Sequence, residues 1–158
     1  MRIGQATDIH QLVENRDLIL GGVKIPYEKG LLGHSDADVL THAIAESILG
    51  ALALGDLGKH FPDTDDKYKN ANSLDLLAEV VRMMQEKDYE IVNVDSTILL
   101  EKPKLVAYKQ QMEVNIAKVL QTAVENVNVK ATRGEKMGFI GRSEGIMAQA
   151  VVLIEKRK

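Results

Sequence analysis

One aspartate and two histidines have the types and spacing of a metal site. Residues 2–10, RIGQATDIH, predict a strand in which Asp8 and His10 lie on one face, because side chains alternate along a strand. His42, in a predicted helix, would bring a third ligand. Two imidazoles, one carboxylate and an open position suit a catalytic zinc or the facial triad of a mononuclear iron enzyme. The alternative interpretation of the Asp-x-His pair is polar residues entering a turn.

Residues 33–42, GHSDADVLTH, predict the start of a long helix. Ser35 is a favourable N-cap, two aspartates follow it, and an apolar run comes next. His34 would then lie beside free backbone N–H groups at the positive end of the helix dipole, where phosphate binds readily. Asp38 precedes His42 by four residues and could orient its imidazole. The alternative is a capped core helix that contains one hydrogen-bonded histidine.

Two segments between predicted elements have the composition of binding loops. Residues 56–72 contain Asp, Gly and Pro throughout, and loops of this length in compact domains are usually functional or disordered. Phe61 and Pro62 supply an apolar anchor, which favours an ordered lid or binding loop. Residues 132–145 carry four glycines, two arginines and two glutamates. Glycine lets backbone approach a ligand and arginine can bind phosphate, so this segment is also a predicted site loop.

The composition limits the other function classes. A chain of 158 residues fits one domain, residues 1–158. Twenty Lys and Arg against 23 Asp and Glu leave a net charge of −3 with no basic patch, so nucleic acid and anionic membranes are poor partner candidates. The absence of cysteine excludes disulfides, thiolate zinc sites and a cysteine nucleophile. No apolar run approaches the roughly 18 residues of a membrane span. We expect a cytoplasmic protein or a mature organellar one.

The hydrophobic patterns predict an α+β fold: a mixed sheet of the four-stranded type, with its helices on one face. The open sheet face would have to be buried, and a partner subunit is the usual answer, so a homo-oligomer is expected. The predicted strands cover residues 2–10, 90–100, 127–131 and 147–154, with a hairpin at 18–20 and 23–25, and the predicted helices begin at residue 36, at a cap on Ser73 and near residue 108.

Seven short motifs follow one another along nearly the whole chain. They are Asp8-Ile9-His10, HSDAD at 34–38, His42, GDLGKHFPDTD at 55–65, KPKL at 102–105, NVKAT at 128–132 and GFIGRSEGI at 138–146. In this order and without an insertion, they closely resemble the 2-C-methyl-D-erythritol 2,4-cyclodiphosphate synthase family of the non-mevalonate isoprenoid pathway.

The resemblance implies a homotrimer, with the sheets packed around a threefold axis and three active sites at subunit interfaces. Members of this family are phosphorus–oxygen lyases that convert 4-diphosphocytidyl-2-C-methyl-D-erythritol 2-phosphate to the cyclic diphosphate and release CMP. By position, Asp8, His10 and His42 match the ligands of one zinc ion per subunit. Glu135 matches the ligand of a magnesium or manganese ion that bridges the diphosphate.

The resemblance also implies a larger set of substrate contacts. His34 matches a catalytic position, and so does residue 133. The matched substrate-binding residues are Asp8, Ile9, His10, His34, Ser35, Asp56, Leu57, Gly58, Phe61, Pro62, Asp63, Thr64 and Asp65, then Leu100, Glu101, Lys102, Pro103, Lys104, Leu105 and Val106 around the cytidine, and Thr132, Arg133, Gly134, Glu135, Phe139 and Arg142.

The chain departs from the family pattern at two places. Ala6 and Thr7 stand where glycine and an aromatic residue are usual before the aspartate. Position 133 is usually a threonine matched to transition-state stabilisation, and here it is Arg133 followed by Gly134. The guanidinium either contacts a substrate phosphate or is turned to solvent by the glycine.

Two other function classes share part of this pattern. An iron oxygenase would use the same triad, but it gives no reason for His34 at a helix N-terminus or for the loop rich in glycine and arginine. A trimeric nucleotide-binding module without catalysis is the non-enzyme alternative, suggested by Arg133.

Overall fold

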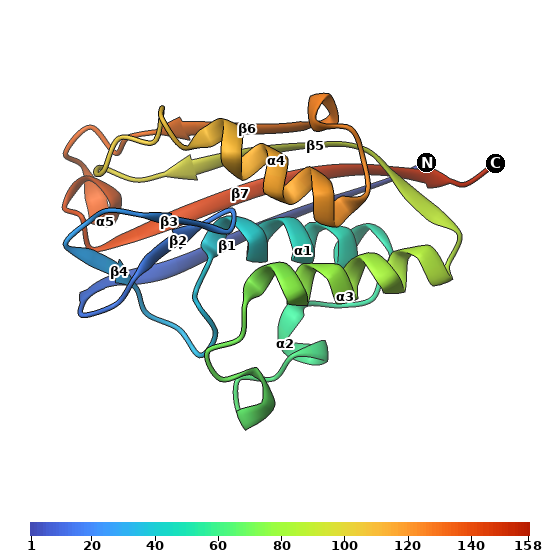
Figure 1. The fold of residues 1–158 in the computed structure, drawn as a ribbon, viewed down its shortest axis with the longest axis horizontal. Helices are drawn as coiled ribbons and strands as arrows, with labels where there is room; N and C mark the ends of the chain where they lie inside the picture. Colours follow the sequence, from blue (N-terminus) through green and yellow to red (C-terminus); the bar gives the residue numbers. More distant parts are fainter.

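The computed structural model describes residues 1–158 and contains a mixed five-stranded sheet in the order β4-β1-β7-β5-β6 (Figure 1). The central strand β7 runs antiparallel to both β1 and β5, and β5 pairs with β6 in parallel. The sequence predicted a sheet of the four-stranded type. The fifth strand is the short β4, which forms an edge by pairing with the last residues of β1. The strands are β1 (Arg2–Glu14), β4 (Lys29–Leu31), β5 (Tyr89–Leu99), β6 (Val127–Thr132) and β7 (Gly145–Lys156), with the predicted hairpin as a separate sheet of β2 (Leu18–Leu20) and β3 (Val23–Ile25).

Three helices longer than two turns cover one face of the five-stranded sheet (Figure 1). Helix α1 packs on β1 and β7, α3 packs on α1, and α4 packs on β6 and α3. The prediction of an α+β fold with helices on one face is therefore confirmed. The helices are α1 (Val39–Ala51), α2 (Leu57–His60), α3 (Ser73–Glu86), α4 (Lys109–Leu120) and α5 (Gly138–Gly141), with 3-10 turns η1 (Asp66–Tyr68) and η2 (Val124–Asn126).

The core lies between the sheet and α1. Alternate residues of β7 from Ile146 to Ile154 are buried, as are Ile44 and Ile48 of α1. Helix α1 approaches β1 closely at Gly4, where an added Cβ would lie 2.7 Å from the Ala51 backbone nitrogen. Only glycine fits there, so this contact sets the spacing between the two elements that carry the predicted metal ligands.

The start of α1 differs from the prediction. Its N-cap is Asp38 rather than Ser35, because Ala37 takes a left-handed conformation (φ 58°) and delays the helix. The buried Asp38 carboxylate accepts hydrogen bonds from the N–H groups of Gly21, Gly22 and Thr41 and from the Thr41 hydroxyl, at 2.8–3.0 Å. Burial raises the pKa of Asp38, although these hydrogen bonds oppose the rise. Asp38 therefore anchors the β2–β3 turn, and the prediction that it orients the helical histidine is wrong.

The second cap also differs. Asn72 is the N-cap of α3, and its side chain accepts a hydrogen bond from the Leu74 N–H at 2.9 Å. Ser73 is the first helical residue and is fully buried. The long segment before it, predicted to be an ordered lid or binding loop, contains the short helix α2 and the turn η1.

The opposite face of the sheet carries no helix (Figure 1). Ile3, Ile9 and Val151 point outward from it and are 71%, 52% and 41% exposed. This confirms the expected open face. No helix of the structure has both the length and the apolar character that crossing a membrane requires.

Candidate active site

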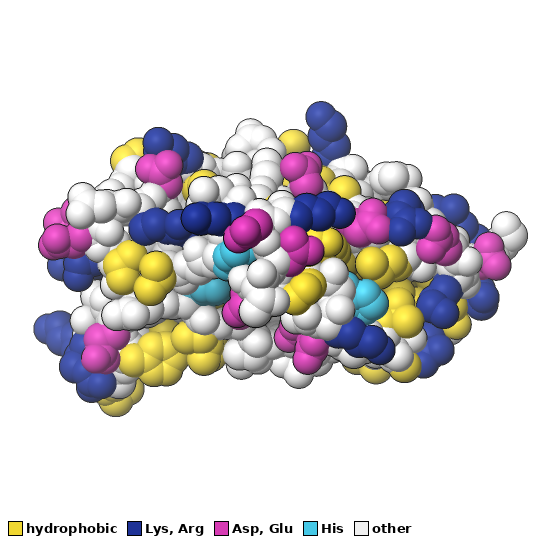
Figure 2. All heavy atoms as spheres, turned by 90° about the horizontal axis from the view of Figure 1, so that it is seen from below, with side chains coloured by type: hydrophobic (Ala, Val, Ile, Leu, Met, Phe, Trp, Pro, Cys, Tyr) yellow, Lys and Arg dark blue, Asp and Glu magenta, His cyan; other side chains and the backbone are white.

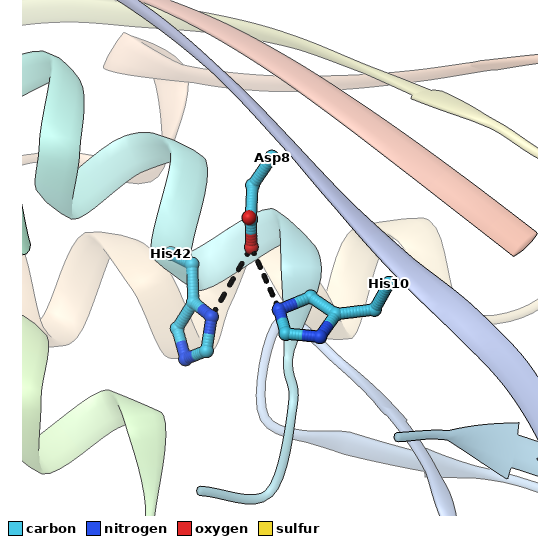
Figure 3. A group of neighbouring side chains, drawn as sticks. All are labelled: Asp8, His10 and His42. Carbon is cyan, nitrogen blue, oxygen red and sulfur yellow. Dashed lines mark hydrogen bonds and ion pairs between the residues drawn. The ribbon is translucent and has the colours of Figure 1, made fainter. Parts of the chain in front are cut away.

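Asp8, His10 and His42 converge on one point between β1 and α1 (Figure 3). Asp8 Oδ2 lies 3.0 Å from His10 Nε2 and 3.2 Å from His42 Nδ1. One potential ligand atom from each residue lies within 4.8 Å of the other two. The strand alternation predicted for Asp8 and His10 produces this arrangement, and α1 adds the third side chain.

The hydrogen bond on the far side of His10 determines which of its nitrogens carries the proton. His10 Nδ1 lies 2.7 Å from the Leu32 carbonyl oxygen, which can only accept, so Nδ1 carries the hydrogen. The lone pair of Nε2 then points at the carboxylate of Asp8, which is also an acceptor. Two acceptors facing each other need a cation between them, either a proton or a metal ion.

The pKa values of Asp8 and His10 agree with this assignment. Burial alone would raise the pKa of Asp8, but hydrogen bonds and charge from His10 and His42 outweigh it and lower the pKa from 3.8 to about 2. Burial likewise opposes protonation of His10, yet the Asp8 carboxylate raises its pKa. The site therefore attracts a cation. Two imidazoles and one carboxylate fit a zinc ion with one coordination position open to a ligand.

The metal-ligand group lines a cavity of about 300 Å³. Figure 2 shows histidine side chains near the middle of this side of the molecule, with acidic side chains beside them. His34 and Ser35 reach the same cavity from the loop before α1, and Phe61 and Asp63 reach it from the loop after α2.

His34 lies five residues before α1 and not at the helix N-terminus, contrary to the prediction. Its Nε2 donates to the Asp65 carbonyl oxygen at 2.9 Å. Phe61 is held by an edge-on contact with Tyr68, whose ring centroid is 5.3 Å away. The 56–72 loop is thus an ordered wall of the cavity, as its composition predicted.

Two polar residues of the site escaped the sequence interpretation. Glu46 lines the cavity one turn beyond His42, a spacing that could have been noticed, and its carboxylate accepts from the Leu57 N–H at 3.0 Å. Ser73 lies 2.7 Å from His42 Nε2. It comes from a helix 31 residues later in the chain, so no local pattern could have indicated it.

The second group of predicted residues forms a separate cavity of about 190 Å³ at the same end of the strands as the metal-ligand group, but across the sheet beside its edge strand β6. A hydrogen bond of 3.0 Å from the Gly134 N–H to Glu101 Oε2 joins its two walls. The lining residues are Leu100, Glu101, Pro103, Lys104, Leu105, Val106, Lys109, Ala131, Thr132 and Arg133, of which Lys109 and Ala131 were not predicted.

Glu135, Phe139 and Arg142 lie outside both cavities within one chain, whereas Arg133 lines the second cavity. Arg133 and Glu135 side chains are 62% and 70% exposed and form a loose ion pair at 3.7 Å. Arg142 pairs with Glu144 at 2.9 Å. Phe139 lines a third cavity beside His10. A single chain thus does not bring Glu135 to the three metal ligands.

Comparison with known proteins agrees with the motifs. Residues 1–155 match the YgbB family. The chain is 58% identical to 2-C-methyl-D-erythritol 2,4-cyclodiphosphate synthase from Clostridium tetani over 156 residues, which cover 99% of each protein. It superposes on the CDP complex of IspF from Plasmodium falciparum with a TM-score of 0.87 and 36% identity, covering 99% of this chain and 97% of that one.

A further solved relative is a longer protein. The chain superposes on the bifunctional IspDF from Campylobacter jejuni with a TM-score of 0.96 and 44% identity. The match covers 99% of this chain but only 42% of the Campylobacter protein, so this chain spans less than half of that relative. The fold of this chain, its metal-ligand group and these similarities together show that it belongs to the YgbB family, the family of the 2-C-methyl-D-erythritol 2,4-cyclodiphosphate synthases.

Proposed function

We propose that this chain is a lyase of isoprenoid biosynthesis that converts 4-diphosphocytidyl-2-C-methyl-D-erythritol 2-phosphate to 2-C-methyl-D-erythritol 2,4-cyclodiphosphate and CMP. The observation that carries the proposal is the convergence of Asp8, His10 and His42 on one point, with acceptor atoms aimed at a cation. The full-length relatives named for this reaction support it, as does the CDP complex of a structural relative.

The reaction joins two anions within one substrate. An oxygen of the 2-phosphate forms a bond to the β-phosphorus, the bond from that phosphorus to the bridging oxygen breaks, and CMP leaves with the bridging oxygen and its electron pair. Asp8, His10 and His42 would hold zinc and Glu135 would hold magnesium or manganese, and these cations would supply the positive charge that offsets phosphate repulsion. No protein nucleophile is required.

The protein's own groups position the substrate. His34 and Ser35 lie in the same cavity as the metal ligands, where we place the phosphate contacts. Cytidine is assigned to the cavity around Pro103 and Lys104, whose turn can present backbone N–H and C=O groups to the base edge. The loop that carries Arg133 borders this cavity and would contact the diphosphate.

We further propose a homotrimer whose open sheet faces pack around a threefold axis. Two observations support it: the apolar side chains left exposed on that face, and the separation of Glu135 and the cytidine cavity from the metal ligands within one chain. Loops from two chains would complete each site. The cytoplasmic location stays a prediction.

Phosphorus NMR of the protein with the cytidyl substrate, zinc and magnesium tests the reaction. We expect the cyclic diphosphate and CMP to appear together. His42→Ala should lose both zinc and activity, whereas His60→Ala is the matched control, because His60 donates to the Leu54 carbonyl away from the metal ligands. Binding of CDP without turnover by the wild-type protein would contradict the proposal and favour a nucleotide-binding module.

A further inference from the structure

On the side that faces away from the metal site, His42 begins a part-buried series of hydrogen bonds. His42 Nε2 lies 2.7 Å from the hydroxyl of Ser73, and that hydroxyl donates to Asp36 Oδ1. We propose that Ser73 and Asp36 are positioning residues that fix the tautomer and the ring orientation of His42. This inference rests on the proposed role of His42 as a metal ligand.

The donor and acceptor of each hydrogen bond from His42 through Ser73 to Asp36 follow from counting protons. The oxygens of the Asp36 side chain accept from two backbone N–H groups, that of Ser73 at 3.0 Å and that of Asp38 at 3.1 Å. The single hydroxyl proton of Ser73 goes to Asp36. The Ser73 oxygen can then only accept from His42, so His42 Nε2 carries the hydrogen.

With the proton on Nε2, the Nδ1 atom of His42 presents a lone pair. That lone pair faces Asp8 Oδ2 at 3.2 Å, in the same way that the Leu32 carbonyl makes His10 present its Nε2. Both histidines are thus held in the tautomer that a metal ion requires, His10 by a carbonyl and His42 by a serine backed by a carboxylate. Partners of this kind raise the basicity of a metal-bound imidazole.

The location of Ser73 makes it the principal partner of His42. Ser73 is fully buried at the first position of α3, and the Asp36 N–H donates to the Ala71 carbonyl at 3.0 Å, so the loop and the helix are joined at this point. Ser35 also lies near His42 Nε2, but at 3.2 Å, and its oxygen already accepts from a backbone N–H. The shorter contact comes from Ser73.

The other acid near the start of α1 cannot take this role. All hydrogen bonds of the Asp38 carboxylate go to Thr41 and to the β2–β3 turn. Asp36 is therefore the carboxylate linked to His42, through a residue that lies 37 positions further along the chain.

Ser73→Ala and Asp36→Asn test the inference. Each should weaken zinc binding, measured by competition with a chelator, by about 10- to 100-fold. Two matched controls should bind zinc as the wild type does. Ser47→Ala removes a buried hydroxyl that donates only to the Ile44 carbonyl within α1, and Asp75→Asn removes an exposed first-turn acid of α3.

Nitrogen-15 NMR of metal-free protein measures which ring nitrogen of His42 carries the proton. A purely structural role of Ser73 would leave this tautomer unchanged. His42 in the wild type should show a protonated Nε2 and an unprotonated Nδ1, and Ser73→Ala should reduce this preference while folding normally. Zinc affinity and tautomer unchanged in both Ser73→Ala and Asp36→Asn would overturn the inference. If His42→Ala kept its zinc, the metal-site proposal itself would fail, and the NMR comparison would still decide the role of Ser73.

Discussion

Replacing Asp8 by asparagine tests whether this carboxylate stabilises the metal-free fold through its charge. Its pKa falls from 3.8 to about 2, and each pKa unit corresponds to about 1.4 kcal/mol, which gives an upper figure of about 2.5 kcal/mol. The side chain is 30% exposed, so solvent screening reduces the expected value to about 1–2 kcal/mol. Asparagine keeps the shape of the side chain but removes the charge.

The two pKa shifts define the pH window of the effect. The contribution of Asp8, whose pKa is lowered, is fully present above pH 3.8 and is lost as the pH falls through about 2. His10 has a raised pKa, so its contribution is fully present below pH 6.5 and is lost as the pH rises through the pKa of the folded state. The difference between wild type and Asp8→Asn should therefore be largest between pH 3.8 and 6.5.

Urea unfolding of chelator-treated protein measures this difference. The protein concentration must be held constant, because association shifts apparent stability. We expect Asp8→Asn to lower the free energy of unfolding at pH 5 and to lower it less, or not at all, at pH 9. Asp17→Asn is the control, since its ion pair with Lys24 is exposed and contributes at most about 1 kcal/mol. An equal loss at both pH values would refute the reasoning.

Three further changes test the packing, the shared site and the departure from the family. Gly4→Ala should lower the free energy of unfolding by about 1–3 kcal/mol, because the new methyl group meets the backbone of α1. The control is Gly50→Ala at an exposed helical position, which should leave this free energy unchanged or raise it by up to about 1 kcal/mol. Urea unfolding compares the two variants. Asp8→Ala and Lys104→Ala should each lose activity alone and recover part of it after subunit exchange, and absence of recovery in proven mixed oligomers would contradict a site shared between chains. Arg133→Ala should lower kcat/KM at least tenfold, about 1.4 kcal/mol, if the guanidinium contacts a phosphate, and wild-type kinetics would place it in solvent.

Features that depend on local periodicity were predictable from the sequence. Alternation along β1 placed Asp8 and His10 on one face, and a glycine pair at 21–22 between two short apolar runs indicated the hairpin. The structure confirms both, because strand geometry and turn chemistry act over a few residues. The β4 edge strand was missed, since three residues are too few to show a period.

The partners of polar groups were not predictable in the same way. Ser35 and Ser73 have the residue type of an N-cap, yet both lie near His42, and the caps are Asp38 and Asn72. Any short polar side chain near a helix start satisfies the local rule, so tertiary packing decides which one caps the helix. Because Ser35 and Ser73 do not cap a helix, their hydroxyl groups can form hydrogen bonds with the imidazole of His42.

The geometry of the proposed metal ligands depends on a contact remote from them. Helix α1 runs alongside β1, with Ala51 near Gly4 at one end and His42 beside Asp8 at the other. A helix transmits displacement along its axis because its backbone hydrogen bonds keep it rigid. A side chain at position 4 would therefore lift α1 from β1 and lengthen the 3.2 Å approach of His42 Nδ1 to Asp8 Oδ2. The absence of a side chain at Gly4 thus helps to keep His42 within reach of a cation bound to the two ligands of β1.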